Sequence, residues 1–218
     1  MLNEAPSIGA TLAAIRAGAA DAEIIVVDGG SVDDSIATAR TGADLILLSQ
    51  RGRARQMNAG AAAASSSVLA FVHADTTVPV SFERDILEAL ADPDILGGRF
   101  DVTLDEPSFV CRLIGELISL RSRISRTATG DQAIFVRKEI FAKLGGFPAF
   151  ELCEDLDFSR KLKRAGKVAC LRSRVTTSAR RWRKDGLLRT IVRMWMIRLL
   201  YLLGVSPSRL KRMYADTR

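Results

Sequence analysis

The sequence predicts an α/β fold in which a mostly parallel sheet is flanked by helices. Short apolar runs, such as residues 23–27 (EIIVV) and 45–48 (LILL), have the length and composition of buried strands. Between these runs lie segments whose apolar residues recur at helical spacing. Strands that alternate with helices build βαβ units, which place neighbouring strands in parallel.

The whole chain follows this alternation. With 218 residues, of which 48% are hydrophobic, it is long enough for one domain with a full core. We expect strands over residues 23–27, 45–48, 68–72, 97–103, 133–136 and 168–171. We expect helices over residues 7–19, 33–40, 53–64, 82–90, 109–124, 138–144 and 154–165.

The segment 187–203 predicts a C-terminal helix that is apolar nearly all round. Arg189 and Arg193 share one face, Arg198 lies nearly opposite Arg189, and apolar residues fill most of the remaining circle. Such a helix is expected to be buried on several sides. Packing on the protein's own body or on a second subunit is therefore favoured over a position at a membrane surface.

The composition argues against several classes of protein. Cys111, Cys153 and Cys170 are an odd number without CxxC spacing, which indicates a reducing compartment and neither a disulfide framework nor a zinc knuckle. We expect no signal peptide, because Asn3 and Glu4 interrupt the N-terminus, and no apolar run reaches the roughly 20 residues of a membrane span. The net charge of +7 and the pI of about 9.8 indicate a surface that attracts anions.

Two acidic residues are predicted at the ligand-binding edge of the sheet. Asp75 follows the apolar run 68–72, and Asp28 follows the run 23–27. Ligands of open α/β sheets bind at the carboxyl ends of the strands. There Asp75 could hold a divalent cation against phosphate oxygens, and Asp28 could accept hydrogen bonds from a nucleobase or ribose. In the alternative interpretation each aspartate simply starts a turn.

Arginines near two predicted elements are candidates for binding phosphate. Arg51, Arg53 and Arg55 lie at the start of a predicted helix, where the helix dipole does not favour cations. They could grip a diphosphate in bidentate fashion. Arg180 and Arg181 could hold a leaving diphosphate. The alternative for both groups is solvated surface charge.

A further group of polar residues comes from the C-terminal half. Glu154 and Asp155 open a predicted helix, where acids complement the helix dipole. One such carboxylate could also take the proton of a sugar hydroxyl as its oxygen attacks. Asp131 and Gln132 offer hydrogen bonds to hydroxyl groups. His73 is the only histidine, so the chain has no histidine cluster for zinc.

Seven sequence motifs follow one another along the chain. They are LNEAPSIGATLAAI, EIIVVDGGSVDDS, GRARQMNAGAAAA, VLAFVHADTTVP, GDQAIFVRKEIFAKLGGFP, CEDLDFSRKLKRAG and TSARRWRKDGLLRTIVRMWMIRLLYLLGVSP. The ordered set resembles the family 2 glycosyltransferases of GT-A fold, over essentially the whole chain. It is most similar to a bacterial subgroup associated with radical-SAM/selenodomain proteins and arsenosugar biosynthesis. The resemblance implies transfer of a sugar from a nucleoside-diphosphate donor to an acceptor hydroxyl, with inversion at the anomeric carbon.

The resemblance also implies roles for individual residues. Glu4 and Asp28 would contact the nucleotide, and Arg53 would support the donor phosphates or base. Asp75 would bind Mg²⁺ or Mn²⁺ on the diphosphate, and Asp155 would be the general base. Asp131, Gln132 and Glu154 would face the sugar or the acceptor.

Two departures from the family pattern affect these expectations. The DxD motif reads His73-Ala74-Asp75, so metal binding depends on fewer carboxylates and is expected to be weak. Members normally have an apolar strand before the Asn3-Glu4 pair, whereas this chain starts at Met1. Either the sheet lacks its first strand, which would leave backbone groups of its neighbours unpaired, or the start codon is placed too late.

We expect one glycosyltransferase domain, with a nucleotide-sugar-binding half (residues 1–105), an acceptor and catalytic half (106–185) and a helical extension (186–218). Its partners would be the donor and the acceptor, without nucleic acid. The extension could contact a membrane surface or a second copy, which suits a cytoplasmic protein or one at the inner face of the membrane. The alternatives are a sugar nucleotidyltransferase, a noncatalytic basic protein that binds anions or membrane surfaces, and a transferase disabled by its missing elements.

Overall fold

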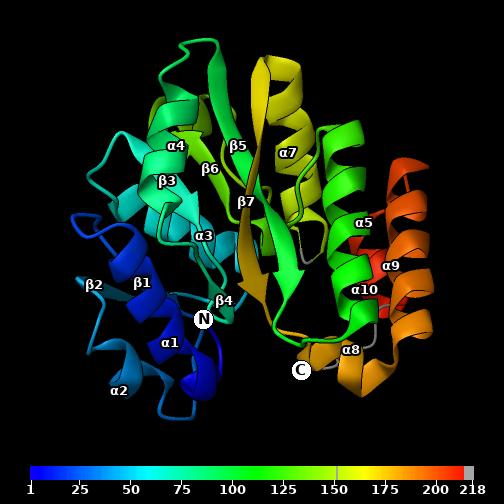
Figure 1. Cartoon of the computed structure of the whole chain (residues 1–218), viewed down its shortest axis with the longest axis horizontal. Helices are drawn as coiled ribbons and strands as arrows, with labels where there is room; N and C mark the ends of the chain where they lie inside the picture. Colours follow the sequence, from blue (N-terminus) through cyan, green and yellow to red (C-terminus); the bar gives the residue numbers. More distant parts are fainter. Residues whose placement is uncertain (151, 214–218) are drawn as a thin grey trace.

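The computed structural model describes residues 1–150 and 152–213 and confirms the α/β class (Figure 1). The strands are β1 (Ile25–Asp28), β2 (Leu45–Leu48), β3 (Val68–Phe71), β4 (Thr76–Thr77), β5 (Ile95–Leu104), β6 (Ile134–Arg137) and β7 (Lys167–Thr177). The helices are α1 (Ala5–Gly18), α2 (Ser35–Ala39), α3 (Arg53–Ala63), α4 (Phe82–Leu90), α5 (Phe109–Ser125), the 3₁₀ turn η1 (Gly130–Gln132), α6 (Lys138–Lys143), α7 (Glu154–Ala165), α8 (Arg180–Asp185), α9 (Leu187–Leu202) and α10 (Pro207–Met213).

The main sheet is mixed, whereas the sequence predicted a mostly parallel one. Its strand order is β3-β6-β5-β7-β4. β5 and β7 pair in parallel, but β6 is antiparallel to both β3 and β5, and β4 is antiparallel to β7. An apolar run shows that a segment forms a strand but not the direction in which it enters the sheet. That direction depends on where the preceding connection returns to the sheet.

β1 and β2 form a separate parallel pair. In the described part of the chain no strand joins this pair to the main sheet, and Met1 and Gln56 meet the other edge of β1. The Val27 carbonyl accepts hydrogen bonds from the Met1 amino group at 2.5 Å and from Gln56 Nε2 at 3.0 Å. The Gly29 N–H donates to the Met1 carbonyl at 2.9 Å. Within the described residues the β1–β2 pair and the main sheet are thus two separate sheets.

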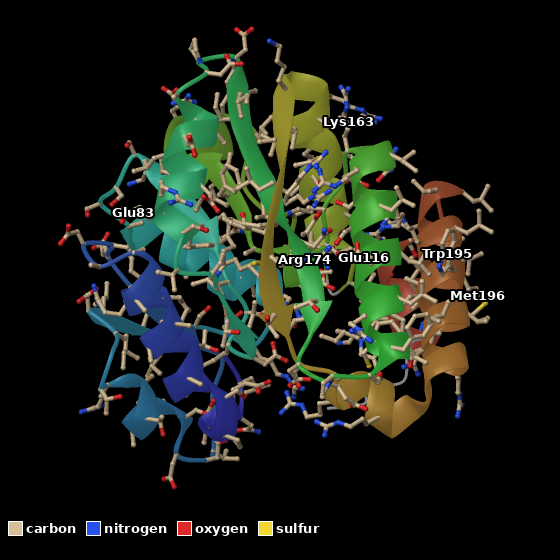
Figure 2. All side chains as sticks on the ribbon, viewed as in Figure 1. Glu83, Glu116, Lys163, Arg174, Trp195 and Met196 are labelled. Atoms are coloured by element: carbon tan, nitrogen blue, oxygen red, sulfur yellow. The ribbon has the colours of Figure 1, made fainter. Side chains whose placement is uncertain are left out.

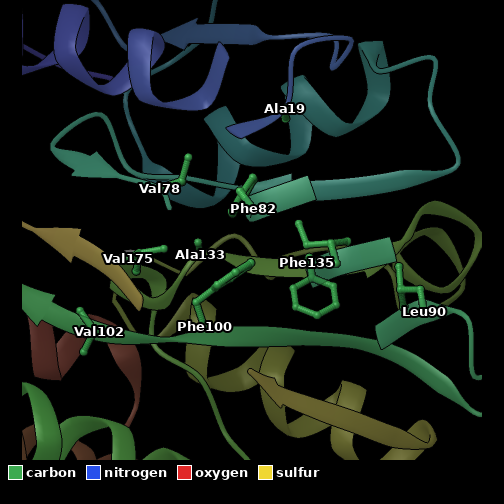
Figure 3. Close-up of a cluster of buried hydrophobic side chains, with 10 residues drawn as sticks. Ala19, Val78, Phe82, Leu90, Phe100, Val102, Ala133, Phe135 and Val175 are labelled. Atoms are coloured by element: carbon green, nitrogen blue, oxygen red, sulfur yellow. The ribbon is translucent and has the colours of Figure 1, made fainter. Parts of the chain in front are cut away.

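Phenylalanine rings on both faces of the main sheet form the core. Phe82 of α4 stacks on Phe100 of β5 with 4.9 Å between ring centroids, and Phe100 meets Phe135 of β6 at 5.9 Å (Figure 3). On the opposite face, Phe141 of α6 and Phe158 of α7 are 5.2 Å apart. Aromatic contacts of this kind bury large areas in defined geometries. They fix α4, α6 and α7 to the sheet.

Helices α5, α9 and α10 lie on the side of the molecule opposite to α1, β1 and β2 (Figure 1). The apolar stripe predicted for α5 is only partly buried, because Ile114 is buried but Val110 and Leu113 are exposed. The expectation that α9 is buried on several sides is also met only in part. Trp195 and Met196 of α9 are exposed (Figure 2). None of the helices within the described residues combines the length and the apolar character that a membrane crossing needs.

Candidate active site

A continuous cavity of about 1980 Å³ brings together segments that are far apart in the sequence. Most of the predicted site residues line it, namely Glu4, Arg53, Asp75, Asp131, Glu154, Asp155 and Arg180. Asp28 and Gln132 are fully buried and lie outside the lining. The side chain of Arg181 is outside the part of the chain that the structure describes.

Glu4, Arg180 and Asp75 form a charged group at one end of this cavity. Glu4 precedes α1, and Arg180 begins α8. Arg180 Nη2 donates to both carboxylate oxygens of Glu4, at 2.8 and 2.9 Å, and lies 3.7 Å from Asp75 Oδ2. The hydrogen bond to Glu4 and the nearby charge of Asp75 raise the pKa of Arg180. Arg180 therefore stays cationic and neutralises two acids from distant parts of the chain.

Asp75 reaches this group through a turn and not directly from a strand. β3 ends at Phe71, and the Thr76 N–H donates to the His73 carbonyl at 3.1 Å to close the turn that contains Asp75. Thr76 then pairs with Thr177, the last residue of β7, just before Arg180. The short β4–β7 ladder thus sets the position of Asp75 relative to Arg180.

Asp28 ends β1, as predicted, but its carboxylate turns into its own loop. Oδ2 accepts hydrogen bonds from the N–H groups of Gly30 and Ser31, both at 2.8 Å, and Oδ1 accepts from Ser31 Oγ at 2.5 Å. Burial alone would raise the pKa of Asp28, but the bonds from Ser31 and Gly30 outweigh it and lower the pKa. Gly30 has a φ of 93°, which suits glycine. Asp28 thereby shapes the Gly29–Gly30 turn that lines the cavity.

Asp155 lies in the first turn of α7 and faces the loop before β6. Its Oδ2 accepts the Gly130 N–H at 2.6 Å, and its Oδ1 accepts the Leu156 N–H at 2.7 Å. A Cβ placed on Gly130 would lie 2.6 Å from His73 Nε2 and 3.5 Å from Asp155 Oδ2. The motif that carries Asp75 and the helix that carries Asp155 therefore meet at Gly130, where no side chain fits between them.

Asp131 and Gln132, which follow Gly130, have different surroundings. Asp131 lines the cavity, and its Oδ1 is buried without a hydrogen-bond partner among the described residues. Gln132 closes a capping box with Thr129 and donates from Nε2 to the Phe100 carbonyl at 3.2 Å. Contrary to the contact predicted for it, Gln132 lies behind the cavity wall and holds η1 in place.

Arg51, Arg53 and Arg55 line the cavity near the start of α3. Gly52, the residue before α3, has a φ of 146°. Arg55 Nη1 donates to Gln50 Oε1 at 2.9 Å. These arginines therefore extend the positive charge of the cavity wall on the side of β1 and β2.

Two further arginines, Arg121 of α5 and Arg198 of α9, were missed by the sequence analysis. Both line the cavity. Burial and the charge of Arg121 lower the pKa of Arg198 to about 10. Burial also lowers the pKa of Arg121, against the opposing influence of Asp131 and Asp155. The one signal in the sequence was the position of Arg198, on the face of α9 opposite to Arg189.

The carboxylates fit a divalent cation only in combination with a ligand. Within residues 1–150 and 152–213, no three side chains of His, Cys, Asp or Glu cluster closely enough to hold a metal ion. Mg²⁺ is commonly held by one or two carboxylates together with substrate phosphates. Asp75 can supply one such carboxylate, so the donor set would be completed by phosphate oxygens.

Comparison with known proteins supports this description of the fold. Mannosyltransferase PcManGT from Pyrobaculum calidifontis, solved with GDP-Man and Mn²⁺, is 20% identical, with a TM-score of 0.64 over 91% of this chain and 58% of that one. TarS 1–349 from S. aureus, solved with UDP, is 18% identical, with a TM-score of 0.62 over 82% of this chain and 58% of that one. The chain thus spans less than two thirds of these structures, and no curated protein matches it in sequence.

The structural likeness confirms the GT-A type of fold that the motifs implied, with the mixed sheet described above. The model of the family "Glycosyl transferase family 2" matches residues 1–141, which include β1 with Asp28, the turn that carries Asp75 and the turn η1. This chain therefore belongs to glycosyl transferase family 2.

Proposed function

We propose that this protein transfers a sugar from a nucleoside-diphosphate donor to an acceptor hydroxyl, with inversion at the anomeric carbon. One observation carries the proposal. The Glu4–Arg180–Asp75 group and the Asp155–Gly130 contact line one cavity, and His73, two residues before Asp75, lies against Gly130. A basic anchor for phosphate and a carboxylate base are thus available to one bound substrate pair.

The donor end of the cavity, as we define it, contains Glu4, Asp75 and Arg180. Arg180 would bind the diphosphate, and Glu4 would hold Arg180 in place. Arg53 and Arg181 are proposed as additional phosphate contacts. Asp28 would position the Gly29–Gly30 turn against the nucleotide. The structures solved with GDP-Man and with UDP support a nucleotide-linked donor.

A cation on the diphosphate would be held by Asp75. Mg²⁺ or Mn²⁺ would neutralise charge that develops on the leaving phosphate. The Mn²⁺ bound in PcManGT supports the use of a divalent cation. Because Arg180 Nη2 already lies 3.7 Å from Asp75 Oδ2, the guanidinium supplies part of this positive charge itself.

The acceptor end of the cavity, as we define it, contains Asp131, Asp155 and the arginines Arg121 and Arg198. Asp155 would take the proton of the acceptor hydroxyl while the hydroxyl oxygen forms a bond to the anomeric carbon. The bond from that carbon to the diphosphate breaks, and its electron pair leaves with the diphosphate. The Gly130 and Leu156 N–H groups orient the carboxylate for this role. Asp131 Oδ1, which has no hydrogen-bond partner among the described residues, would accept a hydrogen bond from a substrate hydroxyl, and Glu154 lines the same cavity.

A thermal-shift screen tests the donor assignment. We expect one nucleoside diphosphate or sugar nucleotide to raise the melting temperature, and Mn²⁺ to increase the shift. Asp75→Asn should remove the increase due to Mn²⁺. Asp34→Asn should keep it, because Asp34 is exposed and its side chain makes no capping hydrogen bond. If no nucleotide stabilises the wild-type protein, the proposed function is wrong.

A further inference from the structure

The cavity continues from Asp155 into a groove between α5 and α9. We call it the α5–α9 groove and define it by Leu117, Leu120 and Ile124 on α5 and Trp195 on α9, with Arg121 and Arg198 at its inner end. All six residues line the same cavity as Asp131 and Asp155. The two helices run along the same side of the molecule (Figure 1). The groove therefore leads from the molecular surface to the proposed base.

The walls of the groove are apolar and open to solvent. Leu117 and Leu120 are each 53% exposed, Trp195 is 64% exposed and Ile124 is 76% exposed. Leu117, Leu120 and Ile124 are three or four residues apart, so they form one stripe on α5. Contiguous apolar surface beside a cavity indicates a ligand or partner that covers it.

The inner end of the groove carries positive charge. Arg198 Nη2 donates to Thr127 Oγ1 at 2.6 Å, and Arg121 Nη2 donates to Thr129 Oγ1 at 3.4 Å. Neither guanidinium forms an ion pair with a carboxylate among the described residues. Arg121 Nε is buried with no hydrogen-bond partner within the described chain. A buried donor left unsatisfied costs free energy, and a bound anion would remove that cost.

The electrostatics of this pair agree with its geometry. Burial lowers the pKa of both guanidinium groups, and the charge of Arg121 lowers the pKa of Arg198 further. Asp131 and Asp155 offset part of the charge on Arg121. The protein thus holds two half-buried cations close to each other and to the carboxylate that is proposed to act on the acceptor.

We infer that the acceptor is an anionic amphiphile, whose apolar chain lies in the α5–α9 groove and whose phosphate or carboxylate is bound by Arg121 and Arg198. This inference rests on the proposed function, because it assigns the acceptor of the same reaction. An anion at the two arginines places the adjoining hydroxyl of the acceptor beside Asp155. A neutral or purely polar acceptor would leave the exposed leucines uncovered and the guanidinium groups without a bound anion.

Binding of octyl phosphate to the full chain tests the inference. Trp195 lies in the groove, so its fluorescence should report binding. Octyl phosphate, octanol and inorganic phosphate are compared below any micellar concentration. We expect octyl phosphate to bind at least about tenfold more tightly than either of the other two probes, because only it uses both parts of the site. Equal binding of octyl phosphate and octanol, or of octyl phosphate and inorganic phosphate, would overturn the inference.

Variants separate a binding role of the arginines from a structural one. Arg121→Gln and Arg198→Gln should each weaken octyl phosphate binding about tenfold. Their melting temperatures should change little, since each substitution removes a half-buried charge that has no ion-pair partner among the described residues but also one hydrogen bond to a threonine. Arg112→Gln, an exposed position on α5, is the matched control and should bind as the wild type does. Unchanged binding in both cavity variants would contradict the inference.

A substitution in the groove wall provides a test that does not alter the buried arginines. Leu120→Asp changes an exposed side chain, so the fold should be kept, while a carboxylate in the groove should repel the anionic probe. Donor binding, measured by the thermal shift with nucleotides, should be unaffected in all of these variants. If nucleotides stabilise the protein but octyl phosphate does not bind, the acceptor assignment fails and the donor assignment stands.

Discussion

The donor end and the acceptor end of the cavity differ in how their charges are satisfied. At the donor end Arg180 donates hydrogen bonds to both carboxylate oxygens of Glu4, and Asp28 accepts three hydrogen bonds from its own loop. At the acceptor end Arg121 Nε and Asp131 Oδ1 are buried and have no partner among the described residues. The charged groups of the donor end are hydrogen-bonded without a ligand, whereas the acceptor end has buried polar atoms that a ligand could hydrogen-bond.

This difference separates what stabilises the protein from what binds its substrates. Hydrogen-bonded acids contribute to the stability of the fold, so their loss should lower the free energy of unfolding. Unpaired buried groups lower stability and persist where function needs them. Substitutions at the donor end should therefore change stability together with nucleotide binding. Substitutions at the acceptor end should change transfer or acceptor binding with little loss of stability.

The largest effect is expected for Asp155→Asn. The amide cannot accept the proton of the acceptor, so transfer should fall by about 10²- to 10⁴-fold. Nucleotide binding should persist, because Asp155 bonds only to backbone groups of Gly130 and Leu156 among the interactions seen in the described chain. Rates of sugar transfer and thermal shifts with nucleotide are measured in parallel. Turnover at the wild-type rate would rule out Asp155 as the base.

Arg180→Gln tests the donor end next. Loss of the guanidinium removes a charge-assisted contact to phosphate, so the affinity for a nucleoside diphosphate should fall about tenfold by calorimetry. Binding of octyl phosphate at the other end should not change. Arg183→Gln is the matched control, since Arg183 is exposed on the same helix. A loss of octyl phosphate binding in Arg180→Gln would show that the two ends are not independent.

Asp28→Asn probes stability through pH. The pKa of Asp28 is lowered in the folded protein, so its ionised form contributes stability that is fully present above the unfolded pKa of about 3.9. This contribution is lost as the pH falls through the folded pKa. Urea unfolding at pH 7 should show a loss of about 2 kcal/mol for the variant, and the difference from wild type should shrink below about pH 4. A difference that does not depend on pH would show that ionisation of Asp28 is not its source.

Much of the fold could be predicted because apolar runs identify strands locally. Residues 45–48 were predicted as a strand and form β2, and residues 68–72 correspond to β3 within one residue. β7 was predicted only over residues 168–171, because its second half, with Arg172, Ser173 and Arg174, lacks an apolar run. The strand directions that make the sheet mixed depend on long-range packing, which the local pattern does not contain.

The site was predictable only where a motif marks it. Asp75 and Asp155 stand out in the sequence as acids beside predicted elements, and the structure places them in one cavity. The contact between Glu4 and Arg180 spans 176 positions, and no local pattern pairs these residues. Arg121 and Arg198 were missed because the sequence of an apolar helix does not show which arginine side chain faces the cavity.

The smallest effect is expected for Ser159→Ala, which tests the boundary between the two ends. Ser159 of α7 is buried, and its Oγ accepts the Ala128 N–H at 2.6 Å. Its loss leaves this buried N–H unsatisfied, so the free energy of unfolding should fall by about 1–2 kcal/mol.

The segment that contains Ala128 also carries Thr127 and Thr129, which accept hydrogen bonds from the two guanidinium groups. Octyl phosphate affinity should therefore fall while nucleotide affinity is kept, and Ser65→Ala, at an exposed serine, should change neither. Equal losses of nucleotide affinity and octyl phosphate affinity would mean that α7 couples the two ends. The donor end could then no longer be treated as complete without a ligand and independent of the acceptor end.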